Sequence, residues 1–161
     1  MKNSVSSLLS PAIGKRVCRI RVGPYRSLTL GVGKRIFHHD PKRTDAYKGE
    51  WEFIAYYSAW RIIRNGRIIA GKGDAEDDYS AFTKKLRSIR FGTLASISQP
   101  SSIDLRLTFS SGITLDMFGT TSDDAAFVDI FLPGNRALCL QPKGKWTIED
   151  SSLPSNPKPV A

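Results

Sequence analysis

The segment "WRIIRNGRII", residues 60–69, constrains the fold more than any other stretch of this sequence. It reads nearly the same in both directions about Asn65-Gly66. Asn-Gly is the strongest two-residue signal for a β-hairpin, because a type I′ turn needs positive φ at both central positions. The segment therefore predicts two antiparallel strands. The expected cross-strand pairs are Arg64 with Arg67, Ile63 with Ile68, and Ile62 with Ile69.

Strict alternation of apolar and polar residues predicts strands along most of the remaining chain. In "KRVCRIRV" we expect Cys18, Ile20 and Val22 to point into the core, and this strand to pair with "RSLTLGV". Further strands are expected in residues 50–63, 93–98, 103–109, 113–118, 126–132, 137–140 and 145–149. Residues 1–12 are expected to form a loose arm, residues 33–49 a long basic loop, and residues 151–161 a disordered tail.

One segment has helical periodicity, and it predicts the main helix at about residues 75–90. Its apolar stripe consists of Tyr79, Phe82, Leu86 and Ile89. Asp74 is the expected N-cap. Acidic residues come first and basic residues last, which matches the helix dipole.

The expected fold is mainly β (α+β), with antiparallel sheets and one main helix in a single domain, residues 1–150. Residues 13–70 and 91–150 resemble each other in strand order and spacing. This similarity predicts two related β-units packed around one core, although alternating strands also look alike by chance.

The net charge of +9 is concentrated in the first part of the chain. Residues 1–70 contain 14 Lys or Arg and 4 Asp or Glu, whereas residues 71–161 contain 10 and 11. Such asymmetry favours an anionic partner, which could be nucleic acid, an acidic protein surface or phospholipid. A basic surface without a specific partner is the alternative.

Catalytic chemistry has little support in the sequence. His38 and His39 are the two histidines, and a metal-independent hydrolase using them is the best enzymatic alternative. They lack neighbouring metal ligands, and we expect no enzyme activity, metal or cofactor. Cys18 and Cys139 have no CxxC spacing and are expected to be thiols. No apolar run reaches the length of a membrane span.

The opposed arginines of the hairpin suggest where a partner would bind. Like charges opposite each other destabilise a hairpin, so they either guard an edge, find local acids, or meet an acidic partner. The predicted partner-binding residues are Lys15, Arg19, Arg21, Arg64 and Arg67. The alternative surface is the acidic start of the helix, Glu76, Asp77 and Asp78, which would suit a cationic nuclease. Aromatic residues near the same cations also permit a nucleic-acid-binding β module.

The motifs "YYSAWRIIRNGRIIAGKGD", "DLRLTFSSGITLDMF" and "KWTIED" resemble those of a group of small bacterial β-rich proteins. Several members are similar to immunity proteins of toxin systems, including contact-dependent growth inhibition. The resemblance covers residues 12–150, and residues 119–143 depart from it as a longer insert. It implies a protein that binds and neutralises a cognate toxin, such as a nuclease domain, without catalysis. A cytoplasmic location is expected separately, because residues 1–16 lack the apolar run of a secretory signal. It also implies structural roles for Trp60, Arg61, Asp74 and Trp146.

Overall fold

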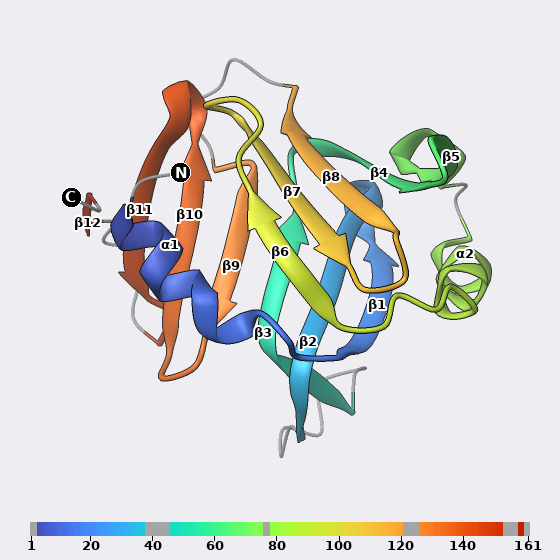
Figure 1. Ribbon diagram of the computed structural model, residues 1–161, viewed down its shortest axis with the longest axis horizontal. Helices are drawn as coiled ribbons and strands as arrows, with labels where there is room; N and C mark the ends of the chain where they lie inside the picture. Colours follow the sequence, from blue (N-terminus) through green and yellow to red (C-terminus); the bar gives the residue numbers. More distant parts are fainter. Residues whose placement is uncertain (1–2, 38–45, 76–77, 121–125, 153–157, 160–161) are drawn as a thin grey trace.

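The computed structural model describes residues 3–37, 46–75, 78–120, 126–152 and 158–159, and forms two antiparallel sheets that face each other (Figure 1). The order of the seven-stranded sheet is β1 (Val17–Gly23), β2 (Ser27–Phe37), β3 (Tyr47–Ala55), β9 (Val128–Leu132), β10 (Arg136–Gln141), β11 (Lys145–Asp150) and β12 (Lys158–Pro159). The order of the five-stranded sheet is β5 (Arg67–Gly71), β4 (Ser58–Arg64), β8 (Thr114–Gly119), β7 (Asp104–Phe109) and β6 (Leu94–Ser98). The helical elements are α1 (Asn3–Leu9), α2 (Tyr79–Arg87) and the 3-10 turns η1 (Ser10–Ala12), η2 (Pro24–Arg26), η3 (Lys72–Asp74) and η4 (Pro142–Gly144). The predicted mainly β fold is confirmed.

The core lies between the two sheets and follows the alternation of the sequence. On β7, Leu105, Leu107 and Phe109 are buried, and the residues between them are partly exposed. Burial of each such side chain contributes about 1.5–3 kcal/mol. Ile103 was expected on the same inward face, but it precedes the strand and is exposed.

The hairpin of β4 and β5 forms as predicted at its tip. Asn65 and Gly66 have φ of 51° and 73°, as a type I′ turn requires, and Arg64 lies opposite Arg67. Further from the tip, Ile62 pairs with Ala70 and not with Ile69, because the register shifts between Ile62 and Ile63. The remaining predicted pair, Ile63 with Ile68, is present.

The main helix is shorter than predicted. Asp78 is its N-cap, and its carboxylate accepts hydrogen bonds from the backbone N–H groups of Ser80 and Ala81, each at 3.0 Å. Asp74 was expected to be the cap, but its carboxylate instead accepts a bond from the N–H of Gly71 at 2.8 Å, within η3. The apolar stripe packs inward as expected, and Phe82 and Leu86 are buried.

Two segments expected to be irregular are ordered. The N-terminal arm forms α1, and it inserts Val5 and Leu9 into the core with no exposed surface. The long basic loop is much shorter than expected, since β2 continues to Phe37 and β3 begins at Tyr47. The predicted disorder of residues 151–161 falls mostly outside the described residues, and Lys158–Pro159 pairs with β11.

A bulge also changes the expected facing of β1. The register of β1 shifts between Val17 and Arg19, so Cys18 is not one of the residues buried in the core. Ile20 and Val22 are buried as predicted. Val17 packs partly against the core in place of Cys18. The bulge thus leaves Cys18 partly buried on β1, outside the set of core residues.

The two halves of the chain have similar connectivity. Strands β1, β2 and β3 are neighbours in one sheet, and the chain then crosses to β4 and β5 in the other. Strands β6, β7 and β8 are likewise neighbours, and the chain then crosses back to β9 and β10. An internal duplication would produce this arrangement, but the duplication itself remains a prediction.

Two glycines allow β2 and β3 to approach closely where the register of β2 is irregular, between Val32 and Arg35. A Cβ atom on Gly49 would lie 2.7 Å from the Cα of Gly31 and 2.7 Å from the carbonyl oxygen of Trp51. Neither contact can be relieved by a side-chain rotation, because both atoms belong to the backbone. The close approach therefore fixes the path of β2 toward Arg35.

Gly49→Ala should destabilise the protein by about 1–3 kcal/mol, the usual cost of overpacking a rigid site. Urea denaturation measures this free energy of unfolding. Gly73→Ala is the matched control, because a Cβ atom there meets no atom within 4 Å. Equal stability of the two variants would contradict the steric explanation.

Candidate functional site: an arginine-lined groove

The site follows from the position of β1 at the edge of its sheet. An edge strand presents backbone N–H and C=O groups that no neighbouring strand satisfies. At the start of β1, the N–H of Val17 donates to the carbonyl of Gly92 at 3.1 Å. Near its end, the N–H of Val22 donates to the hydroxyl of Thr83 on α2 at 2.9 Å. Between these two covered points, the edge of β1 borders an open groove of about 750 Å³.

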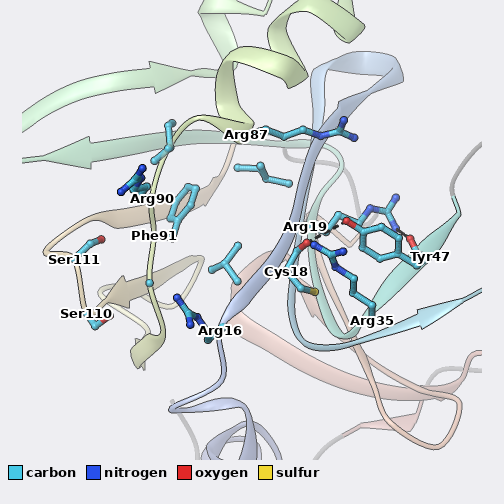
Figure 2. Close-up of a pocket in the computed structure, with 14 residues that line it drawn as sticks. Arg16, Cys18, Arg19, Arg35, Tyr47, Arg87, Arg90, Phe91, Ser110 and Ser111 are labelled. Atoms are coloured by element: carbon cyan, nitrogen blue, oxygen red, sulfur yellow. Dashed lines mark hydrogen bonds between the residues drawn. The ribbon is translucent and has the colours of Figure 1, made fainter.

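Positive charge dominates this groove. Five arginines line it, and no acidic residue occurs among the described residues of its lining. We call it the arginine groove and define it by Arg16, Arg19, Arg35, Arg87, Arg90, Ser110 and Ser111. In Figure 2, Arg16 and Arg90 lie on one side of β1, and Arg19 and Arg35 lie on the other. The groove therefore presents cations along both sides of the edge strand.

The arginines come from separate parts of the chain. Arg16 directly precedes β1, Arg19 lies in β1, and Arg35 lies near the end of β2. Arg87 ends α2, where a cation is favoured by the helix dipole, and Arg90 follows in the segment leading to β6. The bridge between Arg16 and Thr93 holds that segment beside β1.

Two of the arginines are held by neighbouring groups. Arg19 donates to the carboxylate of Glu52 at 3.0 Å and to the carbonyl of Tyr47 at 2.7 Å. The Arg35 guanidinium lies 4.8 Å from the centre of the Tyr47 ring, a cation–π contact. These contacts restrict both side chains before any ligand binds.

The other three arginines point to solvent. Arg16, Arg87 and Arg90 are exposed, and none of them forms a salt bridge within the described ranges of the chain. The hydroxyl groups of Ser110 and Ser111 lie at the same end of the groove as Arg90 (Figure 2). This end offers charged and neutral hydrogen-bond donors, which together suit an anion.

An exposed aromatic residue adjoins the groove. The ring centres of Phe37 and Tyr47 are 5.8 Å apart, and Phe37 is 62% exposed. The Tyr47 hydroxyl donates to the carbonyl of Cys18 at 3.3 Å, which fixes the ring beside the bulge of β1.

Burial raises the pKa of the Cys18 thiol, and the charge of Glu52 raises it further, so Cys18 is a neutral thiol.

The structure brings only one of the predicted partner-binding residues, Arg19, into the groove. Lys15 forms a salt bridge with Glu50 at 3.1 Å, outside the lining. Arg21 lies with Arg19 on the outer face of the seven-stranded sheet, at a second hollow of about 540 Å³. Arg64 and Arg67 occupy the exposed tip of the β4–β5 hairpin, in the other sheet. The predicted residues therefore do not form one continuous surface.

The alternative acidic surface is described only in part. Asp78 caps α2, and Glu76 and Asp77 lie outside the described residues, as do His38 and His39.

Cys18 and Cys139 are both free thiols. Within the described part of the chain, no helix is long and apolar enough to cross a membrane.

The other groove residues have only weak signals in the sequence. Arg87 and Arg90 were assigned to the basic end of a helix, and Arg35 to a loop. Arg16 lies in the segment "KRVCRIRV" but has no distinguishing signal there. Their convergence depends on the contact between the segment after α2 and the start of β1, which is a tertiary contact without a local signature.

Comparison with protein-family models, with curated proteins and with solved structures gives no match. The resemblance to small bacterial immunity proteins therefore remains a prediction.

A second group of titratable residues lies on the outer face of the seven-stranded sheet. Asp129, Cys139 and Glu149 occupy adjacent strands, and the Cys139 thiol lies 3.8 Å from Glu149. Burial raises the pKa of Asp129 to about 6. A hydrogen bond from Cys139 opposes this rise, and the charge of Glu149 adds to it. Burial, followed by the charge of Asp129, raises the pKa of the Cys139 thiol far above its usual value.

Asp129 should make stability depend on pH. Its pKa is higher in the folded state than its usual value of 3.8, so its contribution is fully present below pH 3.8 and is lost as pH rises to about 6. Roughly two pKa units correspond to about 3 kcal/mol. Asp129→Asn should therefore be more stable than the native protein at pH 8, by about 1–3 kcal/mol, and should lose this advantage below pH 4. Urea denaturation at both pH values measures the difference.

Asp116 is the comparison for Asp129, because its pKa is lowered in the folded protein and not raised. Burial alone would raise its pKa, but hydrogen bonds from Arg106 at 2.6 Å and Arg61 at 3.1 Å outweigh that effect and lower it. Its contribution is present above pH 3.8 and is lost as pH falls, so Asp116→Asn should destabilise the protein at pH 8. The same sign of change at pH 8 in both variants would contradict the assignment of Asp129.

Proposed function

We propose that this protein is a non-catalytic binding protein of the immunity type, which captures an acidic segment of a partner protein in the arginine groove. The observation that supports the proposal is the convergence of five arginines without a carboxylate among the described lining residues. The partner would be a toxin domain, as the resemblance of the sequence implies, and occupation of the groove would neutralise it.

Charge and geometry both favour a carboxylate-bearing ligand. Like charges held together oppose folding, and an anionic ligand relieves their repulsion on binding. The guanidinium group matches a carboxylate in a planar, two-pronged arrangement that Lys cannot reproduce. Arg35 is already restrained by Tyr47, so less side-chain entropy is lost when it binds.

The groove alone is smaller than a stable protein interface, which typically covers about 800 Å² per partner. The contact would have to extend to residues around the groove. Phe37, at the end of β2, is an exposed aromatic residue of the kind that dominates binding energy.

Single-stranded nucleic acid is a second candidate ligand, and the group formed by Arg35, Tyr47 and Phe37 favours it. Arginines that follow a phosphate backbone beside an exposed aromatic ring are the usual arrangement for binding single strands. Arg35 stacks on Tyr47, and Phe37 remains exposed beside them. Nucleic acid would then occupy the same groove in place of an acidic protein segment.

Charge reversal in the groove tests the main proposal. Arg87→Glu/Arg90→Glu should weaken binding of a fluorescent peptide rich in Glu by at least about tenfold, because attraction becomes repulsion. Fluorescence anisotropy at low salt measures the affinity. Arg64→Glu/Arg67→Glu makes the same charge change at the hairpin tip and should change the affinity by no more than about twofold. A similar loss in both variants would show only non-specific attraction, and no loss in the groove variant would exclude the groove.

The nucleic-acid candidate makes a different prediction about Phe37. If a base stacks on this ring, Phe37→Ala should cost about 1–3 kcal/mol of affinity for oligothymidylate, measured by anisotropy. The affinity should also fall with salt, with a slope of about 0.7 per phosphate contacted. Ile36→Ala is the control, since Ile36 is a neighbouring, partly exposed apolar residue. Unchanged affinity in Phe37→Ala would remove the observation that favours this candidate.

A further inference from the structure

We infer that the arginine groove receives its partner as an added β-strand: an extended acidic segment pairs with the open edge of β1 at Ile20. The inference rests on the proposed function, because it specifies how the acidic segment of the partner binds. It is based on the backbone of β1 and therefore on a different observation from the charge of the groove.

The hydrogen bonds of Val22 show which backbone groups of β1 point away from β2. Its N–H donates to the Thr83 hydroxyl on α2, and its carbonyl accepts from the same hydroxyl at 3.5 Å. Both groups therefore point away from β2. In an antiparallel strand this direction alternates with a period of two residues, so the N–H and C=O of Ile20 point outward as well. Arg19 and Arg21 lie opposite Gly31 and Thr29 and direct their groups toward β2.

The outward groups of Ile20 face the groove. Across it, in the described part of the chain, no backbone or side-chain group makes a hydrogen bond to them. The neighbouring outward groups are already satisfied, since Val17 bonds to Gly92 and Val22 to Thr83. The open edge is thus short and bounded at both ends, which would fix the register of an added strand.

An added strand would place its side chains among the arginines. Successive side chains of a strand point to opposite faces. Arginines lie on both sides of β1 in Figure 2, with Arg16 and Arg90 on one side and Arg19 and Arg35 on the other. Acidic side chains on both faces of the incoming strand could therefore meet a guanidinium group. The groove also contains Phe91, whose ring would border the strand.

The same geometry favours a peptide over nucleic acid. The outward carbonyl of Ile20 needs a hydrogen-bond donor, and the outward N–H needs an acceptor. A peptide strand supplies both from one residue, at the spacing of a sheet. A phosphodiester backbone supplies only acceptors, so it would leave the carbonyl of Ile20 without a donor.

Backbone N-methylation of a peptide tests this inference. The probe is the Glu-rich peptide, with Glu alternating with Thr or Val, and each residue is N-methylated in turn. Methylation removes one N–H donor without changing charge. We expect a loss of about tenfold or more at one position and small effects at the others, because the outward carbonyl of Ile20 accepts from a single N–H of the peptide. A uniform effect at all positions, or no effect, would overturn strand addition.

Amide exchange in the protein provides an independent measurement. On addition of the unmodified peptide, hydrogen exchange at the Ile20 amide should slow by at least about tenfold, because this N–H gains an acceptor. The amides of Arg19 and Arg21 should change little, since they already face β2. Unchanged exchange at Ile20 under saturating peptide would also overturn the inference.

The charge-reversal variant separates failure of this inference from failure of the proposed function. If Arg87→Glu/Arg90→Glu abolishes peptide binding while N-methylation has no effect specific to one position, the acidic partner stands and strand addition is wrong. If neither change affects binding, both are wrong. If oligothymidylate displaces the peptide and binds much more tightly, nucleic acid replaces the peptide as the ligand and the inference fails.

Discussion

The backbone hydrogen bonds at the free edge of β1 are the constraint on which the rest of the site depends. A sheet that ends in an edge strand must satisfy or expose a row of N–H and C=O groups. This protein covers the first part of the row with the segment around Gly92 and the last part with Thr83 of α2. The middle part, at Ile20, remains beside the arginine groove. The positions of α2, β6 and the groove all follow from how this one edge is covered.

The distribution of charge has two different physical roles in the molecule. Some cations stabilise the folded chain, as Lys15 does with Glu50 and as Arg61 and Arg106 do with Asp116. Others, such as Arg87 and Arg90 in the groove, have no acidic partner within the described ranges. Net charge alone cannot distinguish these roles. The distinction depends on which carboxylates the fold brings near each cation.

The fold could be predicted from the sequence to the extent that local rules determine it. Alternation identified β7 and the inward residues around Leu107, and Asn65-Gly66 identified the hairpin. Local rules failed where tertiary contacts decide the outcome. The bulge at Cys18 depends on pairing with β2, and α1 is ordered because Val5 and Leu9 reach a core built from distant strands. The groove was missed for the same reason, since its arginines meet only after the sheets have packed.

The contact between the start of β1 and the segment near Thr93 has a consequence for how quickly the chain can fold. The two segments are separated by most of the first half of the sequence. Strand β3 likewise pairs with β9, which comes much later in the chain. Pairing between such distant residues requires closure of long loops before any contact compensates for the lost entropy, and proteins rich in such pairings fold slowly. During synthesis, the first strands would remain without their final neighbours until the later half had emerged. The edge of β1 would be longer and less protected at that stage, and association between nascent chains would compete with correct folding.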